Sequence, residues 1–237
     1  MTDRRFSVPF DPDYFARRAA SGDPLDPVEA FRHAYRTNLW AGPESRSGPG
    51  SGLDQTSALR TALPALLRRR QIRSLLDLPC GDWRWMATVD LTGIEYTGGD
   101  LLEELVDQCR RISAGRGRRF VRLDLTASPL PPADLLLCRD CLVHLSVEDI
   151  RRALANIRRS EITWLLTTTF PAQTANRDIV TGDWRPLNLQ LPPFGFPEPV
   201  ELLDEGCTEG EGRFRDKSLG LWRVSDLPAW PAQRGNS

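Results

Sequence analysis

The sequence lacks any long apolar run and any excess of charge of one sign. No run approaches the roughly 20 apolar residues that span a bilayer, and the first 15 residues contain no apolar stretch typical of a signal peptide. The 31 lysines and arginines nearly balance the 32 aspartates and glutamates, for a net charge of -1. Bulk charge therefore offers no attraction to nucleic acid or to an anionic membrane, and we expect a cytoplasmic protein with neither partner.

Cysteine and histidine are also scarce. The five cysteines are an odd, widely spaced set, which does not suit a disulfide framework. Cys138 and Cys141 form a C-x-x-C pair, but no second pair of cysteines or histidines stands at the spacing of a zinc site, so we expect no metal. At 237 residues the chain is long enough to bury roughly 70 to 75% of its unfolded surface without such cross-links.

Short apolar runs alternate with helical patterns through the middle of the chain. Strands are predicted at 73–78, 94–99, 119–124, 133–138 and 161–169, and helices at 83–89, 101–113 and 146–159. This alternation produces parallel strands joined by right-handed crossovers. Two more strands, at 199–206 and 218–224, fit an edge hairpin. The predicted fold is therefore α/β: a Rossmann-like, seven-stranded, mostly parallel sheet with helices on both faces and a C-terminal antiparallel hairpin.

The pattern divides the chain into two parts. Residues 1–53 are predicted to form a loose arm to about residue 24, a short helix over 27–40, and a loop (AGPESRSGPGSG) that folds over a bound cofactor as a lid. Residues 54–237 are predicted to form the main domain, which begins with a helix over 54–70 that Pro64 kinks. Within this domain, residues 170–199 have no helical pattern and are interpreted as a substrate-facing insertion.

Each of the first three strands ends in an acid. In open parallel sheets, ligands bind in the crevice beyond the carboxyl ends of the strands. The first strand ends in Asp77 and a turn in which Gly81 allows a close backbone approach. The second ends in Asp100, about 20 residues after the turn, which is the spacing of an acid that binds ribose hydroxyls. The third ends in Asp124, where it can accept from an adenine amine. Three such acids together favour a nucleoside site over isolated helix caps.

The turn after the first strand discriminates between nucleoside cofactors. A dinucleotide site needs G-x-G-x-x-G so that the pyrophosphate can rest on the next helix, and here these positions are Pro79, Gly81 and Arg84. S-adenosylmethionine carries an amino acid in place of the pyrophosphate and does not need that cradle. An NAD-dependent enzyme is therefore the less favoured alternative.

Five segments, LLDLPCGDW, YTGGDLLEELV, VRLDL, ADLLLCRDCLVHL and ITWLLTTTF, resemble in this order the motifs of class I S-adenosylmethionine-dependent methyltransferases, over roughly residues 72–170. That family usually has D-x-G-x-G-x-G at the first strand, and Pro79 and Trp83 replace the outer glycines here. The resemblance implies S-adenosyl-L-methionine as cofactor, with Asp100 on its ribose and Asp124 near its adenine. The residues expected to bind the cofactor are Asp77, Cys80, Gly81, Asp82, Asp100, Leu101, Asp124, Leu125, Arg139 and, from the predicted lid, Arg46.

The loop after the fourth strand supplies the candidate catalytic groups, His144 and Asp140. An imidazole with its ordinary pKa of about 6.5 suits a general base near neutral pH, and we expect Asp140 to orient it. Methyl transfer depends mainly on alignment, and a base adds about 10² to 10⁴ in rate. A structural role for His144 is the alternative.

The methyl acceptor is predicted to contact the 170–199 segment. Trp184, Arg185 and Asn188 combine flat apolar surface with hydrogen-bonding groups, as a sugar or a ring-bearing small molecule requires. Alternatively, the aromatic residues of this segment only fill the place of a missing helix. The predicted function is O-methylation of a small molecule or glycan. N-methylation of an amine or peptide and a catalytically silent cofactor-binding protein are the alternatives. The sequence indicates no oligomeric state.

Overall fold

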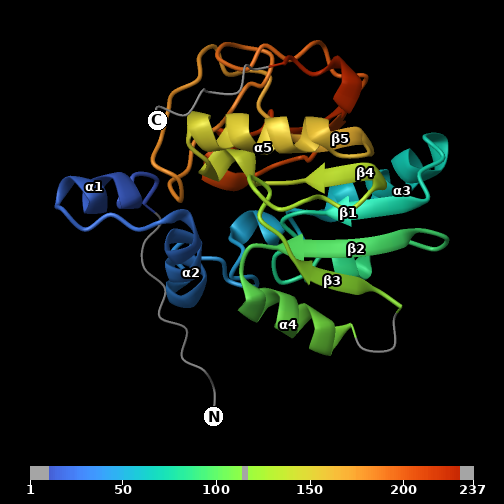
Figure 1. The fold of residues 1–237 in the computed structure, drawn as a ribbon, viewed down its shortest axis with the longest axis horizontal. Helices are drawn as coiled ribbons and strands as arrows, with labels where there is room; N and C mark the ends of the chain where they lie inside the picture. Colours follow the sequence, from blue (N-terminus) through green and yellow to red (C-terminus); the bar gives the residue numbers. More distant parts are fainter. Residues whose placement is uncertain (1–10, 114–116, 230–237) are drawn as a thin grey trace.

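A seven-stranded sheet forms the centre of the protein (Figure 1). The computed structural model describes residues 11–113 and 117–229. The strand order is β3-β2-β1-β4-β5-β7-β6; β7 is antiparallel to both β5 and β6, and the other neighbouring pairs are parallel. The strands are β1 (Ser74–Asp77), β2 (Glu95–Asp100), β3 (Arg119–Arg122), β4 (Ala133–Cys138), β5 (Ile162–Thr169), β6 (Glu201–Asp204) and β7 (Ser218–Arg223). The predicted fold class, a mostly parallel seven-stranded sheet with an antiparallel C-terminal hairpin, is confirmed.

The helices agree with the sequence pattern except in two places. They are α1 (Tyr14–Ala20), α2 (Pro27–Thr37), α3 (Ser57–Arg69), α4 (Glu103–Ile112) and α5 (Val147–Arg159). The helix predicted at 83–89 is wrong, because only the 3-10 turn Met86–Thr88 forms there. The arm predicted to be loose contains α1, and its first ten residues lie outside the described residues. None of the helices in the described ranges is long and apolar enough to cross a membrane.

Local capping explains where two of the helices begin. The Ser146 hydroxyl accepts from the Asp149 backbone N–H at 3.1 Å, which starts α5 where the sequence predicts it. Asp26 accepts from the Glu29 backbone N–H at 3.0 Å and is followed by Pro27 at the first position of α2. These caps fix the ends of the elements that border the crevice.

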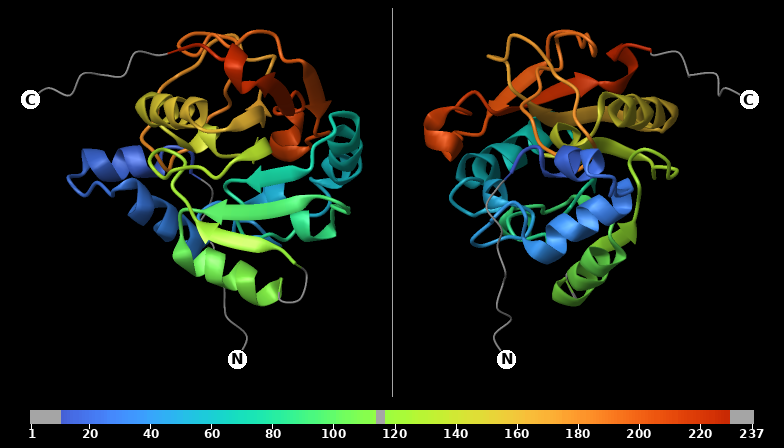
Figure 2. Two further views of the ribbon diagram at one scale, coloured as in Figure 1. Left: turned by 45° about the vertical axis from the view of Figure 1, so that its right-hand side comes forward. Right: turned by 90° about the vertical axis from the view of Figure 1, so that its left-hand side faces the viewer.

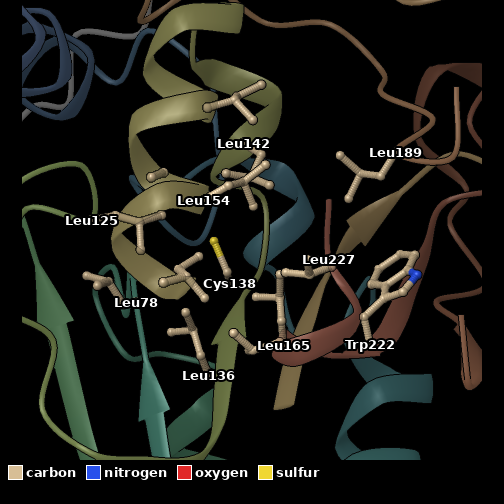
Figure 3. Close-up of a cluster of buried hydrophobic side chains, with 14 of the residues drawn as sticks. Leu78, Leu125, Leu136, Cys138, Leu142, Leu154, Leu165, Leu189, Trp222 and Leu227 are labelled. Atoms are coloured by element: carbon tan, nitrogen blue, oxygen red, sulfur yellow. The ribbon is translucent and has the colours of Figure 1, made fainter. Parts of the chain in front are cut away.

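The alternation of side chains along the strands builds two cores, one on each face of the sheet. Leu76, Leu136 and Leu165 face α5 and are completely or almost completely buried there. Figure 3 shows Leu136 and Leu165 in this core. Leu75, Leu135 and Leu166 point to the other face, where α3 and α4 cover them. The strands are therefore covered on both sides, and their carboxyl ends remain the place for a ligand.

Residues 170–199 complete the first core without forming a helix. Leu187, Leu189, Phe194 and Phe196 are buried in it. The Trp222 indole N–H of β7 donates to the Pro197 carbonyl at 2.8 Å and ties the segment to the edge of the sheet. The segment thus packs as a structural layer, as one of the two sequence interpretations proposes for its aromatic residues.

The N-terminal helices lie on the side to which the arrowheads of β1, β2 and β4 point (Figure 2). The Asp183 carboxylate, from the 170–199 segment, accepts from the backbone N–H groups of Phe15 at 2.7 Å and Ala16 at 3.0 Å. These are first-turn N–H groups of α1, which have no partner inside their own helix. The bond joins two segments that are distant in sequence above the crevice.

We expect Leu165→Ala to lower the free energy of unfolding by about 2 to 5 kcal/mol, because it leaves a cavity at a completely buried position of the first core. Urea denaturation measures the loss. Leu202→Ala is the matched control: Leu202 lies on edge strand β6, 45% exposed, and its replacement is expected to change the free energy by about 0.5 kcal/mol or less. Equal effects of the two changes would contradict this assignment of the core.

Candidate active site

A cavity opens at the carboxyl ends of β1 to β4, between the sheet and α2. All ten residues predicted to bind a cofactor line it, together with Asp140 and His144. Trp184, Arg185 and Asn188 are not part of its lining. Several lining residues were not predicted from the sequence: Phe31, Tyr35, Ser47, Ser51, Trp85 and Thr126 are examples. Most of these come from the N-terminal part.

The turn after β1 is tight and is covered by another loop. Gly81 has a φ of +55°, and a Cβ on it would lie 2.5 Å from the Ser47 hydroxyl oxygen, so glycine is required for both reasons. Between Asp77 and α4, all of whose residues are described, the chain forms no α-helix. The turn therefore offers no helix N-terminus to a pyrophosphate, which fits a nucleoside cofactor that has none.

Asp100, the last residue of β2, is buried, and both of its carboxylate oxygens accept backbone N–H groups. The donors are Gly81 at 3.1 Å and Leu102 at 3.0 Å. Burial raises the pKa of Asp100 to about 6 despite these bonds. The Leu101 backbone N–H also bonds this carboxylate. An ionised carboxylate has about four acceptor sites, so Asp100 keeps capacity to accept from a ribose.

The acids after β1 and β3 differ in their surroundings. Asp77 is buried and accepts from the Tyr96 hydroxyl at 2.6 Å, and burial raises its pKa to about 7. Asp124 is half-buried, and its Oδ1 accepts from both the backbone N–H and the hydroxyl of Thr126 at 2.7 Å. No hydrogen bond among the described residues uses Oδ2 of Asp124, so this oxygen is available to a ligand amine.

Residues 41–52, the 41–52 loop, lie over the turn after β1. The Ser45 hydroxyl donates to Asp82 at 2.7 Å, and the Asp82 backbone N–H donates to the Ser47 hydroxyl at 3.3 Å. Arg46 lines the cavity, and its guanidinium lies over the Tyr35 ring at 5.4 Å from the centroid. The loop thus occupies the position that the sequence predicts for a lid.

A buried cluster of charged side chains lies at the end of β4, where Arg139 and Asp140 line the cavity. Arg139 donates to Glu205 through Nε at 3.2 Å and Nη2 at 2.7 Å, and its Nη2 also donates to the carbonyl of Gly50 in the 41–52 loop at 2.8 Å. Lys217, the only lysine of the sequence, lies with its Nζ 2.7 Å from Asp140 and 3.6 Å from Glu205. The cluster joins the end of β4 to the β6–β7 hairpin and to the 41–52 loop.

The charges in this cluster stabilise one another's ionised forms. Burial opposes ionisation of Asp140, but Lys217 and Arg139 outweigh it and hold the pKa of this carboxyl well below its usual range. Burial likewise opposes the charge on Lys217, and Asp140 and Glu205 still raise the pKa of the lysine. Sequence reasoning missed Glu205 and Lys217, because nothing in the hairpin sequence shows which strand end it meets. The solitary lysine among 30 arginines was the available signal.

His144 is held by a backbone carbonyl and not by Asp140, which corrects the sequence-based expectation. Its Nδ1 lies 2.9 Å from the Asp183 carbonyl oxygen. A carbonyl can only accept, so Nδ1 carries the proton and Nε2 of the neutral ring has the lone pair. Burial lowers the pKa of His144 to about 4. The carboxylate of Asp140 is instead engaged by Lys217, Arg139 and Thr168.

The three residues predicted to contact the acceptor instead make contacts within the protein. Arg185 is fully buried and donates to the carbonyls of Leu142 and Leu145, on either side of His144, at 2.9 and 2.7 Å. The Asn188 amide donates to the carbonyls of Pro171 and Gln173, both at 3.1 Å. Trp184 packs edge-on against Phe170 and Phe214. Composition indicated polar and aromatic surface but could not show that it faces inward.

The thiols offer no alternative chemistry at this site. All five cysteines are free, and four of them are buried. The hydrogen bond between Cys141 and Cys138, followed by burial, raises the pKa of the Cys141 thiol, which favours the unreactive protonated form. Across residues 11–113 and 117–229, no three His, Cys, Asp or Glu side chains come together as a metal site would require.

Comparison with known proteins bears on the domain type and the fold. Residues 75–160 match the family model described as a methyltransferase domain, whereas no curated protein matches the sequence. The solved structure "PigF with SAH" shares 16% identity at a TM-score of 0.58, over 87% of this chain and 64% of that chain. The methyltransferase domain of bacterial CtHen1 shares 12% identity at a TM-score of 0.51, over 73% of this chain and 100% of that chain.

A third similar structure is the PH0226 protein from Pyrococcus horikoshii OT3, with 20% identity and a TM-score of 0.41 over 47% of this chain. The chain spans 56% of the length of that protein and 64% of PigF. At these identities, PigF and CtHen1 show that the fold is shared.

We expect the affinity for S-adenosylmethionine to rise with pH between about 5 and 7. Burial raises the pKa of Asp100 to about 6 and that of Asp77 to about 7. Both acids are therefore protonated at the lower pH, and the cationic ligand prefers their ionised forms. For Asp100 alone the gain is about tenfold. Calorimetric titration at several pH values measures it. Asp77→Asn and Asp100→Asn should each flatten the dependence, whereas Asp107→Asn, on an exposed position of α4, should not. A pH-independent affinity in the unmodified protein would contradict the prediction.

We also expect Glu205→Gln to destabilise the fold by about 3 to 5 kcal/mol, because it removes the charge partner of a buried arginine. The side chains of Glu205 and Arg139 are 1% and 4% exposed. Thermal or urea unfolding measures the loss, with Glu211→Gln, an exposed position of the same hairpin, as the control. A stability equal to that of the control variant would show that the cluster does not fix the hairpin.

Proposed function

The chain carries a class I, S-adenosylmethionine-dependent methyltransferase domain, and we propose that the protein transfers the methyl group to a hydroxyl of a small molecule or glycan. The observation that carries the choice of oxygen is the state of His144. It lines the cavity as a neutral imidazole, with Nδ1 bound to the Asp183 carbonyl. A hydroxyl acceptor must lose a proton, and we propose that Nε2 accepts it.

The acids at the strand ends fit the cofactor group by group. We propose that the remaining acceptor sites of Asp100 bind the two ribose hydroxyls, and that Oδ2 of Asp124 accepts from the adenine amine. Asp77 and the turn around Cys80, Gly81 and Asp82 would border the methionine part, with Arg46 from the 41–52 loop near its carboxylate. Leu101 and Leu125, beside the two outer acids, would pack against the nucleoside, and Arg139 would support the 41–52 loop from below.

The protein's part in the reaction is alignment followed by proton removal. S-adenosylmethionine supplies a methyl group on a sulfonium, whose carbon–sulfur bond breaks with its electron pair going to sulfur. Fixing the acceptor oxygen in line with this bond can contribute about 7 to 11 kcal/mol. His144 Nε2 takes the hydroxyl proton as the oxygen–carbon bond forms. The Asp183 carbonyl keeps the ring in the required tautomer, and the Arg185 donors hold the turn that carries it.

The first experiment compares cofactors. Calorimetric titration with S-adenosylmethionine and with NAD is expected to show binding of the former alone, because the turn after β1 has no helix to receive a pyrophosphate. Mass detection of methylated products from hydroxyl and amine acceptors then separates O-methylation from N-methylation. Absence of S-adenosylmethionine binding at millimolar concentration would overturn the proposal.

We expect His144→Gln to lower turnover of a hydroxyl acceptor by about 10² to 10⁴ while the dissociation constant for S-adenosylmethionine changes by less than about twofold. Transfer of labelled methyl and calorimetry measure the two quantities. The control is His33→Gln, since His33 is the other histidine, stacks on Tyr14 and does not line the cavity. Because the pKa of His144 is about 4, turnover should stay level between pH 6 and 8. Turnover that survives His144→Gln would favour a structural role for this histidine.

A further inference from the structure

The cavity has two chemically different ends. The end beside β1, β2 and β3 carries the acids assigned above to the cofactor. At the other end, Phe31 of α2 and Trp40 of the following turn lie beside His144. The centroids of the Trp40 and His144 rings are 4.7 Å apart, and those of Phe31 and His144 are 6.4 Å apart. These two aromatic rings and the imidazole form what we term the aromatic recess, and no cofactor group requires it.

The two aromatic rings of the recess come from the N-terminal part of the chain, whereas its imidazole comes from the loop after β4. The α2 helix crosses in front of the carboxyl ends of the strands (Figures 1 and 2), and both Phe31 and Trp40 are only half-buried. Half-buried aromatic side chains at the mouth of a cavity provide large, rigid contact surface for a ligand. The recess therefore has the features of a binding surface beside the proposed base.

The polar groups around the aromatic recess are already paired. Asp140 is bound by Lys217 at 2.7 Å, and Nδ1 of His144 is bound to the Asp183 carbonyl. The Tyr35 hydroxyl donates to the Gln108 side chain at 2.8 Å. An acceptor with many hydroxyls would lose its hydrogen bonds to water here and find few replacements. A flat apolar ring loses little on entering and gains contact with Phe31 and Trp40.

From this geometry we infer that the aromatic recess is the acceptor site and that it takes a planar aromatic ring bearing a hydroxyl, so that the acceptor is a phenol-type small molecule and not a glycan. The inference rests on the proposed function and narrows its substrate class. Phe31 and Trp40 hold the ring, and the ring's hydroxyl meets Nε2 of His144. On transfer, the oxygen–carbon bond forms, the carbon–sulfur pair returns to sulfur, and the hydroxyl proton passes to Nε2.

The acidity of the acceptor supports the same class. Burial lowers the pKa of His144. Of the charges that face the ring, Asp140 raises this pKa, whereas Arg185 and Lys217 lower it. The result is a weak base. A phenolic hydroxyl has a pKa of about 10, as in tyrosine, whereas the pKa of an alkyl hydroxyl, which is comparable to water, is far higher. A weak base removes the proton of a phenol far more readily than that of a sugar.

The test uses the full chain saturated with S-adenosylhomocysteine. Three probes are titrated by saturation-transfer NMR: 2-naphthol, 2-naphthalenemethanol and methyl α-D-glucopyranoside. We expect both naphthalene compounds to bind at least tenfold more tightly than the sugar. With S-adenosylmethionine in place of the product, mass detection is expected to find methylated 2-naphthol and no methylated 2-naphthalenemethanol, since the two share a ring and differ in hydroxyl acidity.

The variants locate the binding. Trp40→Leu is expected to weaken 2-naphthol binding at least tenfold, Trp40→Phe less than threefold, and neither to change the affinity for S-adenosylhomocysteine. Trp164→Leu is the control, because Trp164 lies on β5 against Arg223 and does not line the cavity.

Sugar binding as tight as naphthol binding, or an unchanged naphthol affinity in Trp40→Leu, would overturn the inference, as would loss of naphthol binding in Trp184→Leu alone. If Trp40→Leu does not fold, the relative affinities of the naphthalene compounds and the sugar for the unmodified protein still test the inference. Failure of the unmodified protein to bind S-adenosylhomocysteine would instead refute the proposed function.

Discussion

The carboxyl edge of the sheet depends on one buried group of charges. Arg139 and Asp140, at the end of β4, are paired with Glu205 and Lys217 of the hairpin, and Arg139 also binds the Gly50 carbonyl of the 41–52 loop. Removing one partner of a buried pair costs about 3 to 5 kcal/mol, so these three segments cannot separate without breaking the cluster. The cluster therefore fixes the hairpin against the sheet and the loop against the cavity.

A second dependence links the 170–199 segment to the chemistry. In place of a helix, this segment lies along the turn that precedes α5 and donates the Gly182 and Arg185 backbone N–H groups to the carbonyls of His144 and Val143. Its Asp183 contributes twice, through its carbonyl to the His144 ring and through its carboxylate to α1. Because the carbonyl can only accept, it selects the neutral tautomer and leaves Nε2 as the basic atom. One short stretch thus sets the state of the histidine and the position of the helices that border the aromatic recess.

The sequence predicted the sheet and the gathering of the strand-end acids in one cavity, because both follow from local rules. Strand patterns place Asp77, Asp100 and Asp124 at one edge, and the Ser146 cap marks the start of α5. The helix at 83–89 was wrong, since its apolar residues, such as Trp83 and Met86, pack under α3 without a helical backbone. The contacts of His144, Arg185 and Lys217 depend on segments brought together only by the tertiary fold. No local pattern encodes the direction in which such side chains point.

The near-absence of lysine has a practical meaning for the chemistry of this protein. Thirty of its 31 basic residues are arginines, which do not react with amine-directed reagents under mild conditions because the guanidinium stays protonated. The single ε-amine is that of Lys217, whose side chain is 6% exposed beneath Gly50 of the 41–52 loop. Acylation of a side-chain amine therefore requires that this loop lift and that the ion pair with Asp140 open. Lys217 is therefore the one side-chain amine of the sequence whose acylation would report on the position of this loop.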